Sequence, residues 1–255
     1  MAAPITVAVT GLNATDNPGP GITVIRALRD HPDFDGRVVG LAYDSLDPGI
    51  YARELVDDVF LIPYPSQGVE ALEERLRYIN EQVGGIDVLI PTLDAELSSF
   101  IALEETLQEL EIGTFLPTKE QLDMRSKVHL FEFGKKAGIT VPRSRVISSA
   151  ADLYTIHKEI PYPLLIKGVY YGAEVARSVD EAIHAFHRTV AAWGYPVIVQ
   201  AFVVGDELDV VAVGDGEGGL VGAVPMKKTY ITDKGKGWAG ITIRVSELIQ
   251  LTGRF

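Results

Sequence analysis

Short hydrophobic runs alternate with segments of helical periodicity along the first half of the chain. In the segment 69–83, Leu72, Leu76 and Ile79 recur at the spacing of one helix face. The predicted strands are 5–10, 37–42, 57–62 and 87–91, and the predicted helices are 22–31, 69–83 and 96–110. Strands that alternate with helices predict a parallel, doubly wound sheet of the Rossmann-like kind.

The pattern changes in the second half of the chain. One long helical pattern covers 119–138 and ends at Gly138. After it, the predicted strands are 141–147, 162–168, 196–205, 208–216 and 220–228, with one helix at 179–193 and the start of another at 245–255. Successive strands with few helices predict an α+β domain with an antiparallel sheet. The glycine-rich segment 215–219 predicts a hairpin turn.

The change of pattern predicts two domains. We place the boundary near 115–118, so that the first domain is 1–118 and the second is 119–255. The second domain divides into a first lobe, 119–195, and the beginning of a second lobe, 196–255. The polar stretch between Lys228 and Trp238 predicts a mobile loop.

Composition narrows the classes of function. The 255 residues carry a net charge of −12, which disfavours nucleic acid and anionic membranes as partners. Cysteine is absent, which excludes disulfides and fits a cytoplasmic location. No apolar stretch reaches the roughly 18 residues of a membrane span. The apolar run 1–11 lacks a basic flank and predicts a first strand, not a signal peptide.

The loop after the first strand allows a dinucleotide-binding interpretation. Gly11, Gly19 and Gly21 lie between a strand and a helix, and Asp44 ends the second strand. The spacing does not match the fingerprint, because Val24 stands where the third glycine is required. We therefore favour a long turn that leaves a helix N-terminus open to an anion over bound NAD.

Two carboxylates, Asp94 and Glu96, follow the strand 87–91. Such residues act as acid–base groups or cap the next helix, and capping is the favoured interpretation.

The strongest candidate for chemistry is the stretch 162–174. An apolar strand ends on Lys167, and the following loop contains Gly168 and Gly172. A lysine beside glycine-rich backbone suits phosphate oxygens, because glycine allows close approach and exposed N–H groups add donors.

An ordered series of segments extends this signal over the second half. The series is Asp123–Lys127, then FEFGKKAGITVPRSRVI, then YPLLIKG, then VIVQAFVVGDELDVV. It resembles the ATP-grasp superfamily, specifically its carbamoyl-phosphate-synthase-like and carboxylate–amine ligase branch. Residues 1–118 resemble the domain that precedes ATP-grasp in this family, so the resemblance covers nearly the whole chain.

The resemblance implies that ATP binds and assigns residues to it. Lys127 and Lys167 would contact the phosphates, and Tyr171 and Gly172 would belong to a phosphate lid. Gln200 would accept a hydrogen bond from the adenine amino group, Ala201 and Val203 would offer backbone groups to adenine, and Glu207 would bind the ribose hydroxyls. Lys228 belongs to a basic run, with Lys227, Lys234 and Lys236, that resembles a substrate or phosphate loop.

The chain departs from the family pattern in two places. The lid, 168–173, is short and contains two tyrosines where many relatives have glycines. The family also implies Mg²⁺ held by an acid and by an E-x-N triplet, and no such triplet occurs here. We therefore expect an ATP-grasp domain that lacks its C-terminal, metal-binding part, and we assign no metal ligand and no catalytic residue.

Three hypotheses for the function remain open. The first is an ATP-dependent ligase that joins a small-molecule carboxylate to an amine or other nucleophile through an acyl phosphate. Its missing segment is either supplied by another chain or lost from the given sequence. The second is a non-catalytic nucleotide-binding protein or subunit, and the third, disfavoured by the glycine spacing, is a nicotinamide oxidoreductase. The end of the chain should leave Leu248 and Leu251 short of packing partners, which predicts a homodimer, a partner chain or a frayed terminus.

Overall fold

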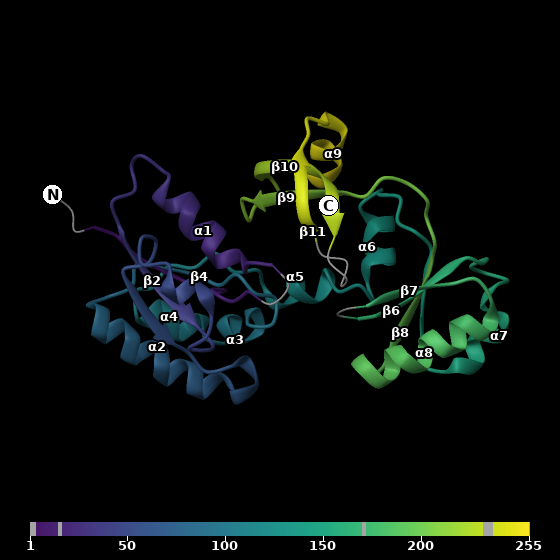
Figure 1. Cartoon of the computed structure of the whole chain (residues 1–255), viewed down its shortest axis with the longest axis horizontal. Coiled ribbons are helices and arrows are strands. Elements are labelled where there is room, and N and C mark those ends of the chain that lie inside the picture. Colours follow the sequence, from purple (N-terminus) through teal and green to yellow (C-terminus); the bar gives the residue numbers. More distant parts are fainter. Residues whose placement is uncertain (1–3, 15–16, 170–171, 232–236, 255) are drawn as a thin grey trace. The chain divides into compact units, whose positions relative to one another are not determined.

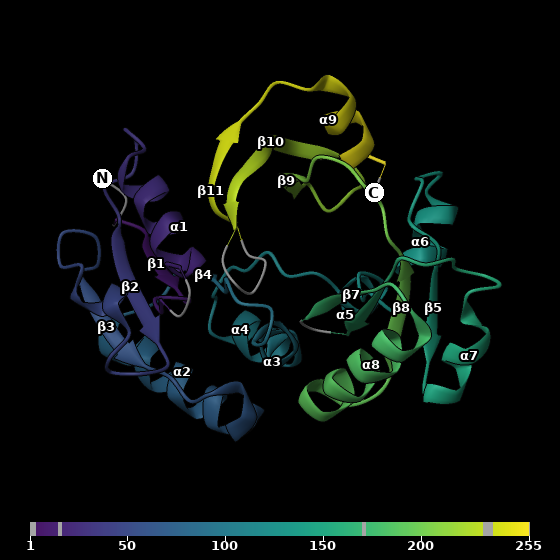
Figure 2. The same cartoon turned by 45° about the vertical axis from the view of Figure 1, so that its right-hand side comes forward.

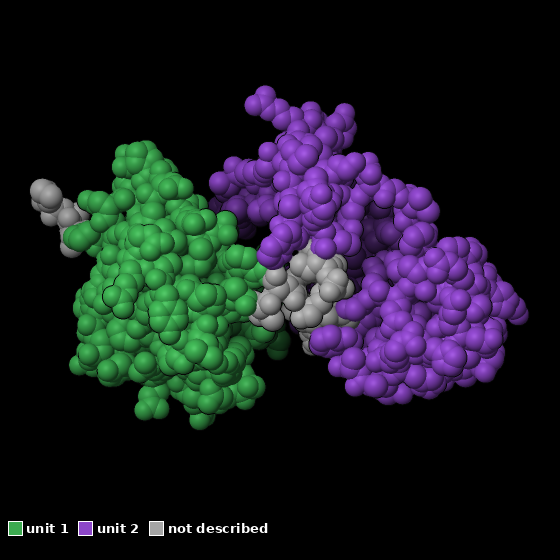
Figure 3. Space-filling model, in the orientation of Figure 1, with its two compact units in different colours: residues 1–121 green, residues 122–255 purple. Residues whose placement is uncertain are grey.

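The computed structural model describes residues 4–14, 17–169, 172–231 and 237–254. The chain divides into two compact units, unit 1 (Met1–Gln121) and unit 2 (Leu122–Phe255), which Figure 3 distinguishes by colour. The boundary predicted from the sequence, after residue 118, precedes the boundary between the units.

Unit 1 is built on a parallel sheet of four strands in the order β3-β2-β1-β4 (Figure 1). The strands are β1 (Thr6–Val9), β2 (Arg37–Ala42), β3 (Asp58–Leu61) and β4 (Val88–Ile90). All of their pairings are parallel, as the alternation of strands and helices predicts. The parallel sheet predicted for the first domain is confirmed.

Helices cover both faces of this sheet (Figure 2). Alternate residues of β1 point to opposite faces, so Val7 and Val9 pack with Ile25 of α1 (Pro20–Arg29). Ala8 faces the other way, in a core formed with α2 (Val69–Val83) and the helices after β4. The helix periodicity of 69–83 is therefore explained by burial of one face of α2 against the sheet.

Two helices predicted as single elements are interrupted. The segment 96–110 forms α3 (Leu97–Ala102) and α4 (Glu104–Glu109), and 119–138 forms α5 (Lys119–Met124) and α6 (Leu130–Lys136). Between α5 and α6, turn hydrogen bonds from Ser126 N–H to Asp123 and from His129 N–H to Ser126 replace the helical pattern. In the described part of the chain, no helix has the length and apolarity needed to cross a membrane.

Unit 2 contains an antiparallel sheet in the order β5-β8-β6-β7. The strands are β5 (Ser144–Ile147), β6 (Leu164–Gly168), β7 (Ala173–Ala176) and β8 (Val197–Ala201). The helix α8 (Val179–Trp193) packs on one face and buries Phe186 among the strands. Strand β8, which the sequence places in the second lobe, pairs within the sheet of the first lobe. The short elements outside the two sheets are η1 (Pro48–Tyr51), η2 (Pro65–Gln67), η3 (Ala150–Asp152) and α7 (Leu153–Ile156).

A second antiparallel sheet follows, in the order β11-β10-β9. Its strands are β9 (Leu208–Gly214), β10 (Leu220–Ile231) and β11 (Gly237–Thr242). The predicted hairpin turn joins β9 to β10, and Asp215 Oδ1 accepts the N–H groups of Glu217 and Gly219 there, each at 2.8 Å. The loop predicted between Lys228 and Trp238 is wrong at both ends, because β10 continues to Ile231 and β11 begins at Gly237. Tyr230 pairs with Ala239 and Ile231 pairs with Gly237, so cross-strand pairing extends both strands into the predicted loop.

The last helix, α9 (Ser246–Thr252), packs against β9 and β10. None of its residues, all of which the structure describes, is buried, and Leu248 and Leu251 are half-buried. The expected dimer, partner chain or frayed terminus stays a prediction.

Truncation of Leu76 tests the core of unit 1. Leu76 lies on α2 and is fully buried, so Leu76→Ala should lower the free energy of unfolding of this unit by about 2–5 kcal/mol. Glu74→Ala, an exposed position of the same helix, should change it by less than about 0.5 kcal/mol. Urea denaturation followed by circular dichroism measures both, and equal effects would contradict the packing of α2.

Candidate functional site

Strand β6 separates the core of unit 2 from a polar sheet face. Leu164 and Ile166 are buried on the side of α8, and the period of two places Lys167 on the opposite side. Gln200 of β8 and Ser144 of β5 are paired residues of the same sheet. Strand pairing thus brings together three polar residues that lie far apart in the sequence.

These three side chains form a chain of hydrogen bonds. Lys167 Nζ donates to Gln200 Oε1 at 2.6 Å, and Gln200 Nε2 donates to Ser144 Oγ at 2.9 Å. Ser144 Oγ in turn donates to the carbonyl oxygen of Pro142 at 3.0 Å. The donors and acceptors match in only one orientation of the amide, so the chain directs the amide oxygen of Gln200 toward the ammonium group.

The electrostatic surroundings of Lys167 identify two further neighbours. Burial lowers the pKa of Lys167, the positive charge of Lys127 lowers it further, and the carboxylate of Glu207 opposes both effects. The predicted phosphate lysines therefore lie close enough to interact, although Lys127 precedes α6 and Lys167 lies in β6. A like-charged neighbour beside a partly buried ammonium disfavours its charged form until an anion arrives.

Strands β9 and β10 bring a third lysine to Glu207. Lys228 Nζ lies 2.6 Å from Glu207 Oε1 and 3.3 Å from Asp209 Oδ2, and its side chain is 12% exposed. The hydrogen bond to Glu207 is the largest effect on the pKa of Lys228, which is raised. A neighbouring pair, Lys227 and Asp206, lies at 2.9 Å on a more exposed part of the hairpin.

Sequence reasoning identified Glu207 and Lys228 but missed Ser144, Asp206 and Asp209. The i, i+2 spacing of Glu207 and Asp209 was a usable signal, because it places both on one side of a strand. No comparable signal marked Ser144.

The remaining predicted residues lie around this cluster or outside the described part. Ala201 ends β8, and Val203, 65% exposed, follows in the segment that leads to β9. Gly172 precedes β7 with φ of 82°, a left-handed conformation that favours glycine. Tyr171, Lys234 and Lys236 lie outside the described residues. The individual roles of all these residues in nucleotide binding stay predictions.

In the glycine-containing loop of unit 1, backbone N–H groups donate hydrogen bonds to carbonyl groups of the same loop. The N–H of Gly19 donates to the carbonyl of Asn13 at 2.6 Å, and that of Gly21 donates to the carbonyl of Gly11 at 3.1 Å. The start of α1 is therefore less open to an anion than the sequence suggests, because two of its backbone donors already have partners.

Glu96 is not a helix cap, which corrects the favoured interpretation of this residue. It stands at the N-cap position of α3, but its side chain makes no capping hydrogen bond. The carboxylate is fully buried and accepts the hydroxyls of Thr10 and Tyr43. It also accepts the backbone N–H groups of Thr92 at 2.8 Å and Leu93 at 2.9 Å. Glu96 therefore joins the carboxyl ends of β1, β2 and β4.

Among the described residues, no group of three or more His, Cys, Asp or Glu side chains could hold a metal ion. The cluster in unit 2 supplies Glu207 and Asp209, and both carboxylates contact Lys228. The described residues therefore do not fit the Mg²⁺ site that the family implies.

Comparison with known proteins finds similarity in sequence and in fold. No family model matches the chain. A stretch of 127 residues is 27% identical to the large chain of carbamoyl phosphate synthase from Clostridium beijerinckii, and it covers 48% of this chain and 12% of the synthase.

Solved structures match over nearly the whole chain. One is the biotin carboxylase domain of 2-oxoglutarate carboxylase from Hydrogenobacter thermophilus, solved with MgADP, ADP and bicarbonate (TM-score 0.69, 17% identity, 98% of this chain and 57% of that one). Another is an L-amino acid ligase from Bacillus licheniformis (TM-score 0.67, 14% identity, 100% of this chain and 61% of that one). The chain thus spans about three fifths of the length of these proteins. The resemblance to the ATP-grasp superfamily and its carbamoyl-phosphate-synthase-like branch is confirmed, and the chain has the ATP-grasp fold.

The interaction of Lys127 with Lys167, the two predicted phosphate lysines, can be tested without a ligand. Lys127→Met should raise the pKa of Lys167, because it removes a positive charge that now lowers it. Lys158→Met, which removes an exposed lysine that does not contribute to this pKa, is the control. NMR titration of the lysine side chains measures the change, and an unaltered Lys167 in the Lys127 variant would contradict the proximity.

Proposed function

We propose that unit 2 binds ATP at the cluster formed by Lys127, Lys167, Gln200, Glu207 and Lys228. The observation that carries this proposal is the interaction of Lys167 with residues from three other parts of the unit: Lys127, Gln200 and Glu207. The MgADP and ADP bound to a protein of the same fold add support.

The charges of the cluster suit a polyphosphate. Lys127 and Lys167 disfavour each other's charged form, and partial burial of Lys167 adds to this cost. A triphosphate between them removes both disadvantages, because its oxygens supply negative charge and accept charge-assisted hydrogen bonds. In the free protein, Gln200 holds the Lys167 ammonium at the sheet face.

The acceptors of the cluster suit a nucleoside. The amide oxygen of Gln200 has two lone pairs and uses one for Lys167, so it can also accept an adenine N–H. The carboxylate of Glu207, held by Lys228, keeps acceptor capacity for the ribose hydroxyls. The exposed side chains of Phe202, Val203 and Val204 provide apolar surface next to Ala201.

Ligation of a carboxylate to an amine is the reaction that we propose for this protein. A carboxylate oxygen would attack the γ-phosphorus of ATP, the bond from that phosphorus to the bridging oxygen would break, and ADP would leave. An amine would then attack the acyl carbon, lose a proton and release inorganic phosphate. The residues of this chain would bind and orient the phosphates. We derive no step through Mg²⁺, since the described residues do not fit it.

Removing the Lys167 charge tests nucleotide binding. Lys167→Met should weaken ATP binding by at least about tenfold, the scale of a charged hydrogen bond lost to a neutral side chain. Lys158→Met, the exposed control, should leave the affinity unchanged. Titration calorimetry measures the ATP affinity of both variants, and equal affinities would mean that Lys167 does not contribute to ATP binding. ADP release in the presence of a carboxylate and an amine separates ligation from binding alone.

The lowered pKa of Lys167 predicts how binding depends on pH. In the free protein, Lys167 loses its proton at a lower pH than an ordinary lysine. A bound polyphosphate favours the charged form and raises this pKa, so binding takes up protons between the free and bound values. Affinity should therefore be greatest below the free pKa and fall as the pH rises through it. Calorimetry in buffers of different ionisation enthalpy detects the uptake, and proton release would contradict the prediction.

A further inference from the structure

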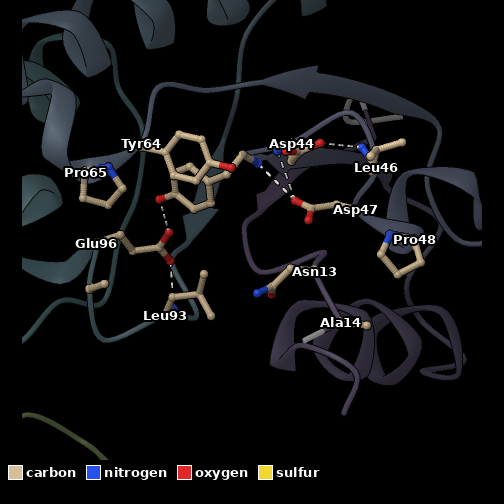
Figure 4. A pocket seen from close by; sticks show the side chains of 12 residues that line it. Asn13, Ala14, Asp44, Leu46, Asp47, Pro48, Tyr64, Pro65, Leu93 and Glu96 are labelled. Carbon is tan, nitrogen blue, oxygen red and sulfur yellow. Dashed lines mark hydrogen bonds between the residues drawn. The ribbon is translucent and has the colours of Figure 1, made fainter. Parts of the chain in front are cut away.

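A pocket of about 470 Å³ lies in unit 1, at the carboxyl ends of its parallel strands (Figure 4). Segments that follow β1, β2, β3 and β4 all contribute to it. In open parallel sheets this edge is where ligands bind, because the loops that diverge there leave a crevice. The polar and aromatic residues that line the pocket are Asn13, Tyr43, Asp44, Asp47, Tyr64 and Glu96.

Two tyrosines form a flat, firmly held wall. The rings of Tyr43 and Tyr64 stack, with centroids 5.4 Å apart and an angle of 21° between their planes. The hydroxyl of Tyr43 donates to the buried carboxylate of Glu96, and this hydrogen bond holds the Tyr43 ring in place. Burial, with the charge and hydrogen bond of Glu96, raises the pKa of Tyr43, so this phenol stays neutral.

The ionisable residues of the lining are acidic or tyrosine, and among the described residues no lysine, arginine or histidine lines the pocket. Asp44 Oδ1 accepts the N–H of Leu46 at 2.8 Å, and Asp47 Oδ2 accepts the N–H of Tyr43 at 3.2 Å. Each carboxylate keeps further lone pairs for a ligand. The pocket therefore presents negative charge and hydrogen-bond acceptors next to an aromatic surface.

We propose that this pocket binds a small organic cation: a primary ammonium compound with a flat apolar group. The ammonium would face Asp44 and Asp47, while the apolar group would lie against the stacked rings of Tyr43 and Tyr64. Anions of similar shape are disfavoured by three carboxylates without a cation to compensate them. The inference goes beyond nucleotide binding and does not depend on it, because all of its residues belong to unit 1.

Phenethylamine is a suitable probe, because it joins one ammonium to one aromatic ring. Added to the ¹⁵N-labelled full chain without nucleotide, it should shift the amide resonances of Asp44, Leu46 and Tyr64. The isosteric anion 3-phenylpropanoate should cause no saturable shifts there, and 2-phenylethanol should bind more weakly than the amine. Raising the NaCl concentration from about 0.05 M to about 0.5 M should weaken binding of the amine and leave binding of the alcohol unchanged.

Isosteric variants test whether the negative charges of Asp44 and Asp47, rather than the shape of the pocket, are needed for binding. The double variant Asp44→Asn and Asp47→Asn keeps an acceptor oxygen at each position and should bind phenethylamine about tenfold more weakly. Glu81→Gln removes an exposed charge of α2 outside the pocket and should change the affinity less than about twofold.

Several outcomes would overturn the proposal. Equal binding of the amine and the anion, shifts confined to residues outside the pocket, or unchanged affinity in the double aspartate variant would each do so. Should the double aspartate variant fail to fold, the salt dependence still decides. ATP binding, tested through Lys167, is measured separately, so that failure of one proposal leaves the other standing.

Discussion

The period of two in strand β6 is the constraint on which the unit 2 site depends. Leu164 and Ile166 must face α8 to build the core, and this places Lys167 on the other face of the sheet. Partial burial there makes the charged ammonium costly, so it needs a nearby acceptor. Gln200 supplies that acceptor at 2.6 Å. Core packing and ligand chemistry are thus two consequences of one strand register.

Unit 1 also contains a charged group that is buried, the carboxylate of Glu96. Glu96 is fully buried, and isolation of its charge from water would be strongly unfavourable without compensating donors. Two hydroxyls and two backbone N–H groups supply them, from residues 10, 43, 92 and 93. These donors follow three different strands, so the carboxylate also fixes the loops that line the pocket.

The two units therefore present opposite chemistry. In unit 2, Lys127 and Lys167 together favour an anion, and Lys228 is retained near them by Glu207. In unit 1, Asp44 and Asp47 favour a cation beside an aromatic wall. Both arrangements occur in a chain of net charge −12, so local placement of charges, and not the overall charge, decides what each site can bind.

The sequence alone determined the two-part architecture and most of its elements. The helices 69–83 and 179–193 and the strand 37–42 have the bounds that periodicity predicts, because burial of one face against a sheet is a local, repeating signal. The order of the lysine and acidic positions along the chain also indicated the resemblance to the ATP-grasp superfamily.

Tertiary structure alone decided which side chains meet. The partners of Glu96 include Thr10, 86 positions away in the chain, and no local pattern predicts such a contact. The interruption after α5 places Lys127 in a turn, and pairing between β10 and β11 extends both strands into the segment predicted as a loop. These features depend on contacts between distant segments, whereas sequence periodicity reports only which face of each element is buried.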